Sequence, residues 1–511
     1  MRYYLGVDNG GTTTKAALFD ENGREIASAA TGTAMITPKS GFTERDMEEM
    51  WRANCSVIRQ VLDKSGCRPQ QVAAVAICGH GKGLYLWGKN GKPVRPGVIS
   101  TDNRAWRYVQ RWKENGVEAR AFPISLQHVM ACQPVALLAW LKDNEPESYA
   151  GIGWIFECKD YVRFRLTGEA LAEITDYSGT GLLNLRTREY DRHLLELFGI
   201  EEILEALPPL CGSADVCGRV TREAAEACGL MEGTPVAGGM FDIDACALAT
   251  GVVDPQNICM IAGTWSINEY LRSEPVTDGR VLMNSLFCLP EYYLIEESSP
   301  TSAGNNEWFA RQLLPEIAAE EEKAGRSVFG LLERWVDGIP PETFCPVFLP
   351  FLLASNVHPN AKGSFVGLGN FHTRAHLARS VWEGITFSHK YHLDKLLATR
   401  GEPPRAIRLS GGATRSKVWT QMFADCTGLP VETVTANETG ALGCAVAASV
   451  AVGDRASLAE AANAMCSIAP AVLPRPEHRD AYAQKYSLYL RLIEALDPVW
   501  PEMQALAEKS I

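Results

Sequence analysis

The chain contains 511 residues, which at roughly 150 residues per domain predicts about three domains or two large ones. Apolar residues make up 46% of the chain and charged residues 22%, a balance that excludes a mostly disordered protein. Lys and Arg total 49 against 61 Asp and Glu, and the resulting net charge of −12 forms no tail. Since a nucleic-acid backbone requires a basic surface, we expect no nucleic-acid partner.

Cysteine usage and hydropathy indicate the compartment. The 15 cysteines are scattered singly, without a Cys-x-x-Cys pair, which is typical of a reducing environment. Residues 1–7 reach Asp8 too early for a signal peptide. The most apolar stretch, residues 441–452, is too short to span a bilayer. The sequence therefore predicts a cytoplasmic protein without a membrane partner.

The chain opens with short strands, which form an antiparallel meander, followed by a helix. The first turn of the meander is rich in Gly and Thr. Asp46 and Glu49 predict a capping box for the helix, and Gly66 predicts its end. The strands of this region are expected at residues 3–7, 15–19, 25–30 and 72–78.

After residue 251 the pattern of strand, small-residue turn and strand is repeated, at residues 258–261 and 267–271. The repeat indicates two domains of similar design, with a boundary near residues 245–255. Strands that alternate with helices predict an α/β protein. The later helices are expected at residues 135–142, 219–228, 376–399, 418–427 and 441–452.

The first turn, within residues 8–15, is a candidate phosphate site. A turn without bulky side chains exposes backbone N–H groups, which bind phosphate oxygens, and three Thr hydroxyls and Lys15 add donors and charge. Asp8, at the strand end, can hold Mg²⁺ directly or through water. The alternative is a Gly/Thr-rich hairpin that binds nothing.

Two later segments have related patterns. Residues 263–266 form the same kind of turn, so that two turns could grip one polyphosphate. In residues 409–416 a strand runs into Gly-Gly and then a helix, whose N-terminus favours anions. For each segment the alternative is an ordinary turn without a ligand.

Residues 238–244 present carboxylates between a small-residue strand end and an Ala-rich helix. Asp242 could accept a proton from a hydroxyl group. The alternative is a structural role as the N-cap of the helix. If Asp244 is the N-cap instead, Asp242 is free for chemistry.

Taken together, these motifs resemble the FGGY family of carbohydrate kinases, within the actin, hexokinase and Hsp70-like ATPase group. Within the family, the sequence is most similar to xylulose kinases of the L-xylulose type, notably at residues 77–83 and 299–308. Two departures leave the sugar open: Leu137 stands where the family usually has Lys, and residues 80–83 replace a Gln-Met-His-Gly segment. The other matching segments are residues 41–46, 102–104, 159–168, 348–351, 363–368, 376–383 and 438–445.

The resemblance implies an α/β fold with two ribonuclease H-like domains and a cleft between them. Residues 1–248 would form the N-terminal domain, with the sugar site and the first phosphate turn, and residues 249–511 the nucleotide-binding C-terminal domain. The implied site residues are Asp242 as general base and sugar ligand; Gly81, Lys82 and Asp102 facing the sugar; Thr12, Thr13, Lys15, Gly263 and Thr264 contacting the phosphates; Gly304, Gly411, Gly412 and Ser416 lining the nucleotide; and Asp8 organising Mg²⁺.

The activity implied by the resemblance is ATP-dependent phosphorylation of xylulose to xylulose 5-phosphate, with ATP/ADP and Mg²⁺ as cofactors. The expected partners are a small-molecule sugar and a second copy of the chain in a homodimer, and closure of the two domains would exclude water. Three alternatives remain open: another substrate (ribulose, 3-keto-gulonate, gluconate or glycerol), a non-kinase actin-like or Hsp70-like ATPase, and an inactive sugar sensor.

Overall fold

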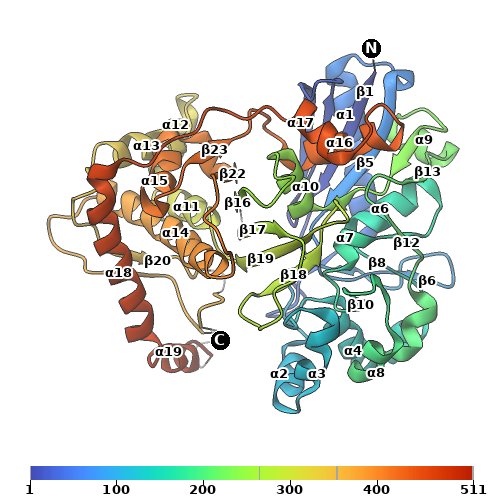
Figure 1. Ribbon diagram of the computed structural model, residues 1–511, viewed down its shortest axis with the longest axis horizontal. Coiled ribbons are helices and arrows are strands. Elements are labelled where there is room, and N and C mark those ends of the chain that lie inside the picture. Colours follow the sequence, from blue (N-terminus) through green and yellow to red (C-terminus); the bar gives the residue numbers. More distant parts are fainter. Residues whose placement is uncertain (1, 264, 353–354, 359, 509–511) are drawn as a thin grey trace. The chain divides into compact units, whose positions relative to one another are not determined.

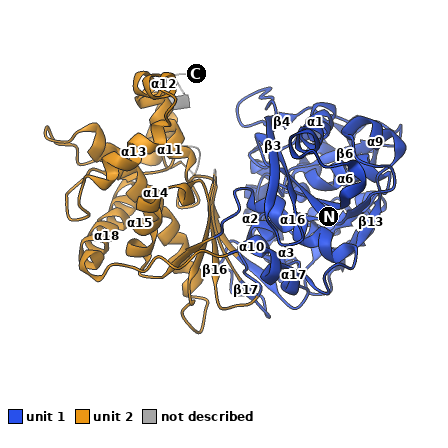
Figure 2. Ribbon diagram, turned by 90° about the horizontal axis from the view of Figure 1, so that it is seen from above, with its two compact units in different colours: residues 1–253, 271–295, 434–467 blue, residues 254–270, 296–433, 468–511 orange. Residues whose placement is uncertain are grey.

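The computed structural model describes residues 2–263, 265–352, 355–358 and 360–508. They form two compact units, each assembled from separate stretches of the chain (Figure 2). Unit 1 comprises residues 1–253, 271–295 and 434–467, and unit 2 comprises residues 254–270, 296–433 and 468–511. The sequence predicts two domains that are each continuous, with a boundary after residue 248. This division stays a prediction.

Unit 1 contains a sheet with the strand order β13-β14-β5-β1-β2-β3, and β15 pairs with β5. Its strands β1, β5 and β13 are labelled in Figure 1. Neighbours in β1-β2-β3 are antiparallel, whereas β5 runs parallel to both β1 and β14. The strands are β1 Tyr3–Asn9, β2 Thr13–Phe19, β3 Glu25–Gly32, β5 Val72–Gly79, β13 Val216–Arg219, β14 Pro235–Ala237 and β15 Met240–Phe241.

A second sheet repeats this design with the order β18-β19-β17-β16-β22-β23. Here β16 and β17 are antiparallel, and β22 runs parallel to both β16 and β23, as β5 does to its neighbours in the first sheet. The predicted α/β class with two ribonuclease H-like domains is confirmed. The strands are β16 Ile258–Ala262, β17 Ser266–Arg272, β18 Met283–Leu286, β19 Tyr293–Ser299, β22 Ile407–Gly411 and β23 Val431–Thr433.

Helix α1 covers one face of the first sheet, and its buried Val57 and Ile58 belong to the same apolar core as Leu18 and Val75. The helices of unit 1 are α1 Met47–Ser65, α2 Trp106–Glu114, α3 Val117–Ser125, α4 Pro134–Asn144, α5 Pro146–Ala150, α6 Cys158–Thr167, α7 Ile174–Tyr177, α8 Arg192–Phe198, α9 Arg222–Cys228, α10 Asp242–Ala249, α16 Thr439–Ala451 and α17 Leu458–Met465.

The close packing of helix α16 explains why its sequence is rich in small residues. A Cβ atom added to Gly6 on β1 would lie 1.9 Å from the carbonyl oxygen of Ala441. A Cβ on Gly443 would lie 2.2 Å from the carbonyl oxygen of Ala245 on α10. The close approach of α16 to both elements therefore requires glycine at these positions.

The remaining elements are the helices of unit 2 and short strand pairs. The helices are α11 Gly304–Trp308, α12 Pro315–Lys323, α13 Val328–Asp337, α14 Arg374–Leu397, α15 Lys417–Thr427, α18 Arg479–Leu496 and α19 Trp500–Glu508. The pairs are β4 Glu44–Arg45 with β7 Gly97–Val98, β6 Tyr85–Gly88 with β8 Ile152–Phe156, β9 Ala172–Glu173 with β12 Leu210–Cys211, β10 Leu183–Asn184 with β11 Glu189–Tyr190, and β20 Val347–Leu349 with β21 Ser364–Val366.

One predicted helix boundary is wrong. The helix expected from residue 219 begins at Arg222, because Thr221 is its N-cap and accepts a hydrogen bond from the N–H of Ala224. Residues up to Arg219 belong to strand β13 instead.

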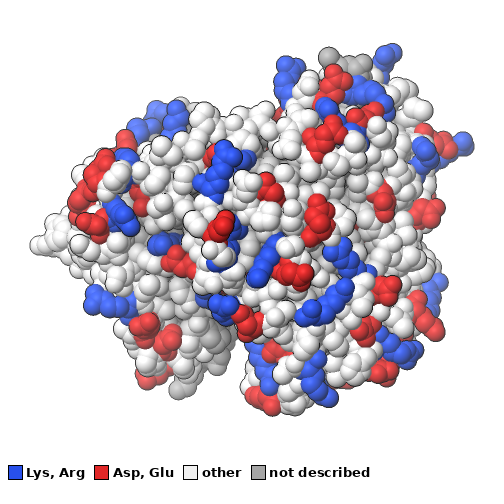
Figure 3. All heavy atoms as spheres, viewed as in Figure 1, with Lys and Arg blue, Asp and Glu red and all other residues white. Residues whose placement is uncertain are grey.

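Two surface properties bear on partners. Within the described ranges, none of the helices combines the length and the apolar composition needed to cross a membrane. On the face drawn in Figure 3, basic and acidic side chains are interspersed.

Candidate active site

The carboxyl ends of β1, β5 and β15 meet at one edge of the unit 1 sheet. The register pairs Asp8 with Cys78, Asn9 with Gly79, and Phe241 with Gly79. Asp8 and the residue after Phe241, Asp242, therefore lie at the same edge. Ligands of α/β sheets bind outside the carboxyl ends of parallel strands, so this edge is the candidate active site.

The turn between β1 and β2 is open on its outer side. The N–H of Gly10 donates to the carbonyl oxygen of Thr13 over 3.0 Å, which closes the turn. A Cβ atom added to Gly11 would meet no atom within 4 Å, and Thr12 is exposed. Thr13 is half-buried at the start of β2. The predicted phosphate-binding residues of this turn thus surround free space.

Behind this turn, Asp8 lies opposite Lys15 in the β1–β2 register. The Nζ of Lys15 forms an ion pair with Oε2 of Glu438 at 2.9 Å. Burial raises the pKa of the Asp8 carboxyl, and the charge of Lys15 opposes this shift. A Cβ on Gly440 would lie 2.9 Å from Asp8 Oδ2, so the start of α16 packs directly on this carboxylate. Sequence reasoning gave Glu438 no role.

Asp242 is the first residue of α10 and is half-buried. The proposed alternative, that Asp244 caps this helix, is wrong: Phe241 is the N-cap, and Asp244 lies within the first turn. The buried Asp244 accepts a hydrogen bond from the N–H of Cys288 at 3.2 Å, and burial raises its pKa well above the usual range. Of these two carboxyl groups, Asp242 is therefore the accessible one.

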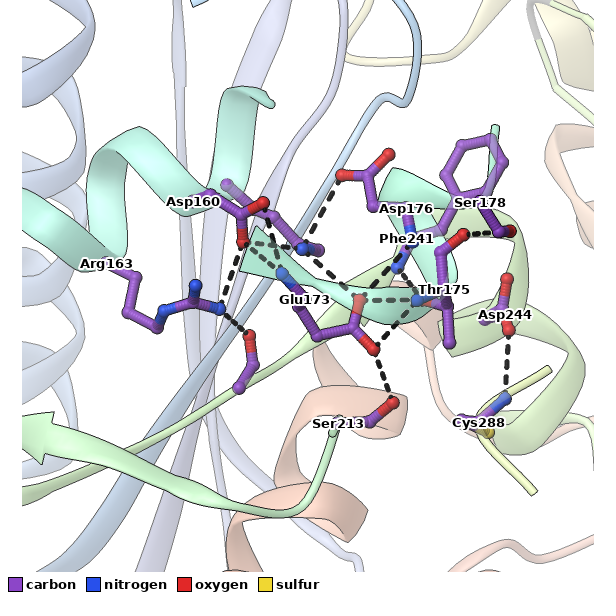
Figure 4. A network of polar contacts seen from close by, with 12 residues as sticks. Asp160, Arg163, Glu173, Thr175, Asp176, Ser178, Ser213, Phe241, Asp244 and Cys288 are labelled. Carbon is purple, nitrogen blue, oxygen red and sulfur yellow. Dashed lines mark hydrogen bonds and ion pairs between the residues drawn. The ribbon is translucent and has the colours of Figure 1, made fainter. Parts of the chain in front are cut away.

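A buried ionic network lies beside Phe241, the residue that precedes Asp242 in the sequence (Figure 4). The Nζ of Lys159 contacts Asp160 at 2.8 Å, Glu173 at 3.3 Å and Asp176 at 3.6 Å. Burial alone would lower the pKa of Lys159, but these carboxylates raise it. Arg163 adds a second cation, 3.0 Å from Asp160. The network holds several charges without exposure to solvent.

A chain of hydrogen bonds links this network to the helix that carries Asp242. The hydroxyl of Thr175 donates to Glu173 over 2.8 Å and accepts from the N–H of Phe241 at 3.0 Å. Ser213 donates to the same Glu173 carboxylate over 2.7 Å. The network therefore fixes the backbone immediately before Asp242. Sequence reasoning missed Glu173 and Thr175, whose only signal was their place after the Lys159-Asp160 motif.

The loop after β5 approaches the same helix start. A Cβ on Gly81 would lie 2.5 Å from the Phe241 ring and 2.7 Å from Asp176 Oδ1, so glycine permits this approach. The buried Lys82 has a positive φ of 64°, and its Nζ lies 5.7 Å from the centroid of the Phe241 ring. These two predicted sugar-facing residues thus lie beside the residue that precedes Asp242.

Asp102, the third predicted sugar-facing residue, is held by protein groups. Its carboxylate accepts hydrogen bonds from the N–H of Thr43 at 2.7 Å and from the backbone N–H and Nε of Arg104, both at 2.9 Å. The guanidinium of Arg104 also stacks over the Phe42 ring, 4.2 Å from its centroid. Asp102 is therefore rigidly oriented, with much of its acceptor capacity in use.

In unit 2, the predicted nucleotide residues gather at the carboxyl ends of β16 and β22. The register pairs Ala262 with Gly411, which places Gly263 beside Gly411 and Gly412. The N–H of Ala303, which precedes Gly304, donates to the carbonyl oxygen of Gly263 over 2.9 Å. The predicted residue Thr264 lies outside the described residues.

Gly411 and Ser416 also have structural roles. Gly411 has a φ of 90°, and a Cβ there would lie 2.5 Å from the carbonyl oxygen of Ala262, so the backbone itself demands glycine. Ser416 is the N-cap of α15, and its hydroxyl accepts from the N–H of Trp419 at 3.1 Å. The same hydroxyl donates to Glu333 over 2.7 Å.

No group of three or more His, Cys, Asp or Glu side chains that could hold a metal by themselves occurs in the described part of the chain. Mg²⁺ is usually bound by one or two carboxylates together with water and substrate phosphates. Asp8, next to the open turn, is the carboxylate that fits this requirement.

Both halves of the chain match one family of known proteins. Residues 3–249 match the N-terminal domain, and residues 258–452 the C-terminal domain, of the FGGY family of carbohydrate kinases. An L-xylulose/3-keto-L-gulonate kinase from Escherichia coli is 37% identical over 502 residues, covering 97% of both chains. A probable L-xylulose kinase from Pasteurella multocida is 37% identical, covering 97% of this chain and 99% of the relative.

A solved structure shows the same fold. The ligand-bound xylulose kinase from Lactobacillus acidophilus matches with a TM-score of 0.87 at 24% identity, covering 98% of this chain and 100% of that one. At this identity the likeness concerns the fold alone.

Proposed function

Because the chain belongs to the FGGY family of carbohydrate kinases, we propose that it transfers the γ-phosphoryl group of ATP to O5 of xylulose. The observation that carries the choice of sugar is the 37% identity, along 97% of the chain, to a kinase named for L-xylulose and 3-keto-L-gulonate. L-xylulose is therefore the first substrate to test. The non-kinase ATPase alternative is set aside by family membership.

In the proposed reaction, Asp242 orients the sugar hydroxyl and takes its proton as the new O–P bond forms and the bond to the ADP oxygen breaks. Support comes from its position: Asp242 is half-buried, begins α10 and follows a backbone held by Thr175 and Glu173. A fixed backbone restrains the carboxylate, as positioning catalysis requires.

The proposed phosphate contacts are the N–H groups and hydroxyls of the β1–β2 turn, with Lys15, and the Gly-rich ends of β16 and β22. Asp8 would hold Mg²⁺, which when bound supplies neutralising charge on the phosphate oxygens. Gly81, Lys82 and Asp102 would face the sugar, and the first two of these residues lie beside Phe241, which precedes the proposed base. The phosphate contacts proposed individually are Thr12, Thr13, Gly263 and Thr264, and the residues proposed to line the nucleotide are Gly304, Gly411, Gly412 and Ser416.

A sugar panel tests this function. ADP release is coupled to a spectroscopic readout with L-xylulose, D-xylulose, 3-keto-L-gulonate, ribulose, gluconate and glycerol, using Asp242→Asn as the inactive control. We expect the highest kcat/KM with L-xylulose. A higher value with 3-keto-L-gulonate would replace the proposed substrate by a sugar acid, whose carboxylate the cationic Lys82 suits. Size-exclusion chromatography tests the proposed homodimer, and fractionation of cells tests the proposed cytoplasmic location.

A further inference from the structure

Arg45, on the two-residue strand β4, lies behind the open β1–β2 turn. Its side chain is buried, with 1% of the residue exposed. Its Nη2 donates to the carbonyl oxygen of Gly10 over 3.0 Å and also to that of Gly11. Its Nη1 lies 3.6 Å from the sulfur of Met50. The guanidinium thus spans two successive peptide groups of the turn.

The charge of Arg45 has no acidic partner in the described part of the chain. The adjacent Glu44 pairs with Arg104 at 2.7 Å and with Arg95 instead. Burying a positive charge without a carboxylate partner destabilises the folded protein. The presence of Arg45 at this position therefore indicates that its charge has a function. The charge of Arg45 also affects the neighbouring His80. Burial is the larger cause and the charge of Arg45 the next in lowering the pKa of His80 to about 3.

The two hydrogen bonds also determine where the turn's donors point. In a planar trans peptide the C=O and N–H groups point in opposite directions. The carbonyl of Gly10 shares its peptide plane with the N–H of Gly11, and the carbonyl of Gly11 shares its plane with the N–H of Thr12. Because Arg45 holds both carbonyls on the inner side, both N–H groups point outward.

The outward side of the turn is empty. A Cβ on Gly11 would meet nothing within 4 Å. Among the described residues, neither the N–H of Gly11 nor that of Thr12 donates to a protein acceptor. Two successive free N–H groups with a positive charge behind them form an anion-binding surface. The end of β1 that enters the turn is held by a separate contact, since Asn54 Nδ2 donates to Asn9 Oδ1 over 2.8 Å.

We propose that Arg45 is a positioning residue for phosphoryl transfer: it turns the N–H groups of Gly11 and Thr12 toward the polyphosphate and adds positive potential behind them. The proposal rests on the proposed kinase function but not on the identity of the sugar. Arginine suits this task because the two N–H groups of Nη2 are fixed in the guanidinium plane and reach one carbonyl each, whereas the N–H groups of a lysine ammonium rotate.

The test compares Arg45→Gln and Arg45→Lys with a matched control, Arg59→Gln. Arg59 also donates to two successive carbonyls, those of Glu226 and Ala227, but these belong to α9 and not to the turn. ADP affinity is measured by calorimetry without sugar, and kcat/KM is measured separately for ATP and for the sugar.

We expect Arg45→Gln to weaken ADP binding and lower kcat/KM for ATP by about 10- to 100-fold, with KM for the sugar unchanged. Arg45→Lys, which keeps the charge, should lose less. Arg59→Gln should behave as the wild type. A folded Arg45→Gln with wild-type ADP affinity overturns the proposal, as does an equal loss in Arg59→Gln.

Two further measurements keep the proposal testable if Arg45→Gln does not fold. In the wild-type protein, ADP should slow hydrogen exchange at residues 11–12, and unchanged exchange overturns the proposal. Gly11→Ala, which places a methyl group in free space, should fold normally and weaken ADP binding severalfold. If ADP binding depends on Arg45 but another sugar is phosphorylated, only the proposed substrate fails; if xylulose is phosphorylated without this dependence, only the role of Arg45 fails.

Discussion

The strand order β3-β2-β1-β5-β14 of the first sheet corresponds to β19-β17-β16-β22-β23 in the second, but the buried polar groups behind their first turns differ. In unit 1, Lys159 lies between Asp160, Glu173 and Asp176, and Arg45 holds the β1–β2 turn. In unit 2, the equivalent β16–β17 turn is followed by Ser266, whose hydroxyl contacts Nδ1 of the buried His389 at 3.0 Å. Ser302 contacts the other nitrogen of this ring at 2.8 Å.

The buried polar groups near the first turn are charged in unit 1 and neutral in unit 2. Burial lowers the pKa of His389 to about 3, so this ring is neutral at physiological pH. Unit 1 therefore carries ionised groups around the proposed base, whereas unit 2 supports its turn with hydroxyl groups and an uncharged ring. The same topology accommodates both arrangements because ion pairs compensate the buried charges in unit 1 and hydrogen bonds satisfy the buried ring in unit 2.

The largest expected effect concerns the two aspartates of α10. Asp242→Asn should lower kcat by about 10²- to 10⁴-fold, because the sugar hydroxyl loses its base. Asp244→Asn is the matched control: Asp244 is buried, burial raises its pKa well above the usual range, and an amide oxygen can accept the N–H of Cys288 in its place. Coupled ADP release measures both variants. Near wild-type turnover in Asp242→Asn contradicts the proposed mechanism.

The next effect tests the cost of buried charge in unit 1. Lys159→Met leaves Asp160, Glu173 and Asp176 without their shared cation and should destabilise the protein by about 3–5 kcal/mol. Lys142, which pairs with Glu202 at the surface, provides the control, and Lys142→Met should cost less than about 1 kcal/mol. Denaturant unfolding measures both, and equal losses would show that burial of the ion pairs carries no special weight.

A smaller effect separates the two glycines after β22. Gly411→Ala should destabilise the protein by about 1–3 kcal/mol, because its φ of 90° and the Ala262 carbonyl oxygen, 2.5 Å from the new Cβ, both oppose a side chain. Gly412→Ala should leave the melting temperature unchanged, since the nearest atom lies 4.0 Å away. Equal melting temperatures for the two variants would contradict the described backbone.

The smallest effect is a pH dependence in unit 2. An unfolded histidine titrates near pH 6.5, whereas burial, with a contribution from His392, lowers the His389 pKa to about 3. As pH falls below about 6.5, His389 binds a proton in the unfolded state but stays neutral in the folded state. The free energy of unfolding therefore decreases. Between roughly pH 6.5 and pH 5 this loss is about 1.5 kcal/mol.

The comparison with His389→Gln isolates this loss. The wild-type curve alone is not sufficient, because Asp176 and Asp244 have raised pKa values and act with the opposite sign. Guanidinium unfolding at both pH values should show a smaller acid loss in the variant. An identical loss in variant and wild type would contradict a buried, neutral His389.

Local patterns predicted several elements well. Helix α1 begins after Asp46, whose side chain accepts from the N–H of Glu49 at 2.6 Å, and ends at Gly66 with a φ of 64°. Each of these residues acts on the helical turn next to it, so its role can be predicted from the sequence. The role of Asp244 was mispredicted because its partner, the N–H of Cys288, lies 44 residues away.

The sequence by itself determined the α/β class, the repeat of strand, turn and strand, and the placement of Asp242 at a helix start. These depend on residue periodicity and turn chemistry, which act over a few neighbouring positions. Only the tertiary structure decided that Lys15 pairs with Glu438, that Glu173 and Thr175 hold the backbone before Asp242, and that Arg45 holds the first turn. Such contacts join distant segments, and their energies depend on burial and distance, which no local pattern records.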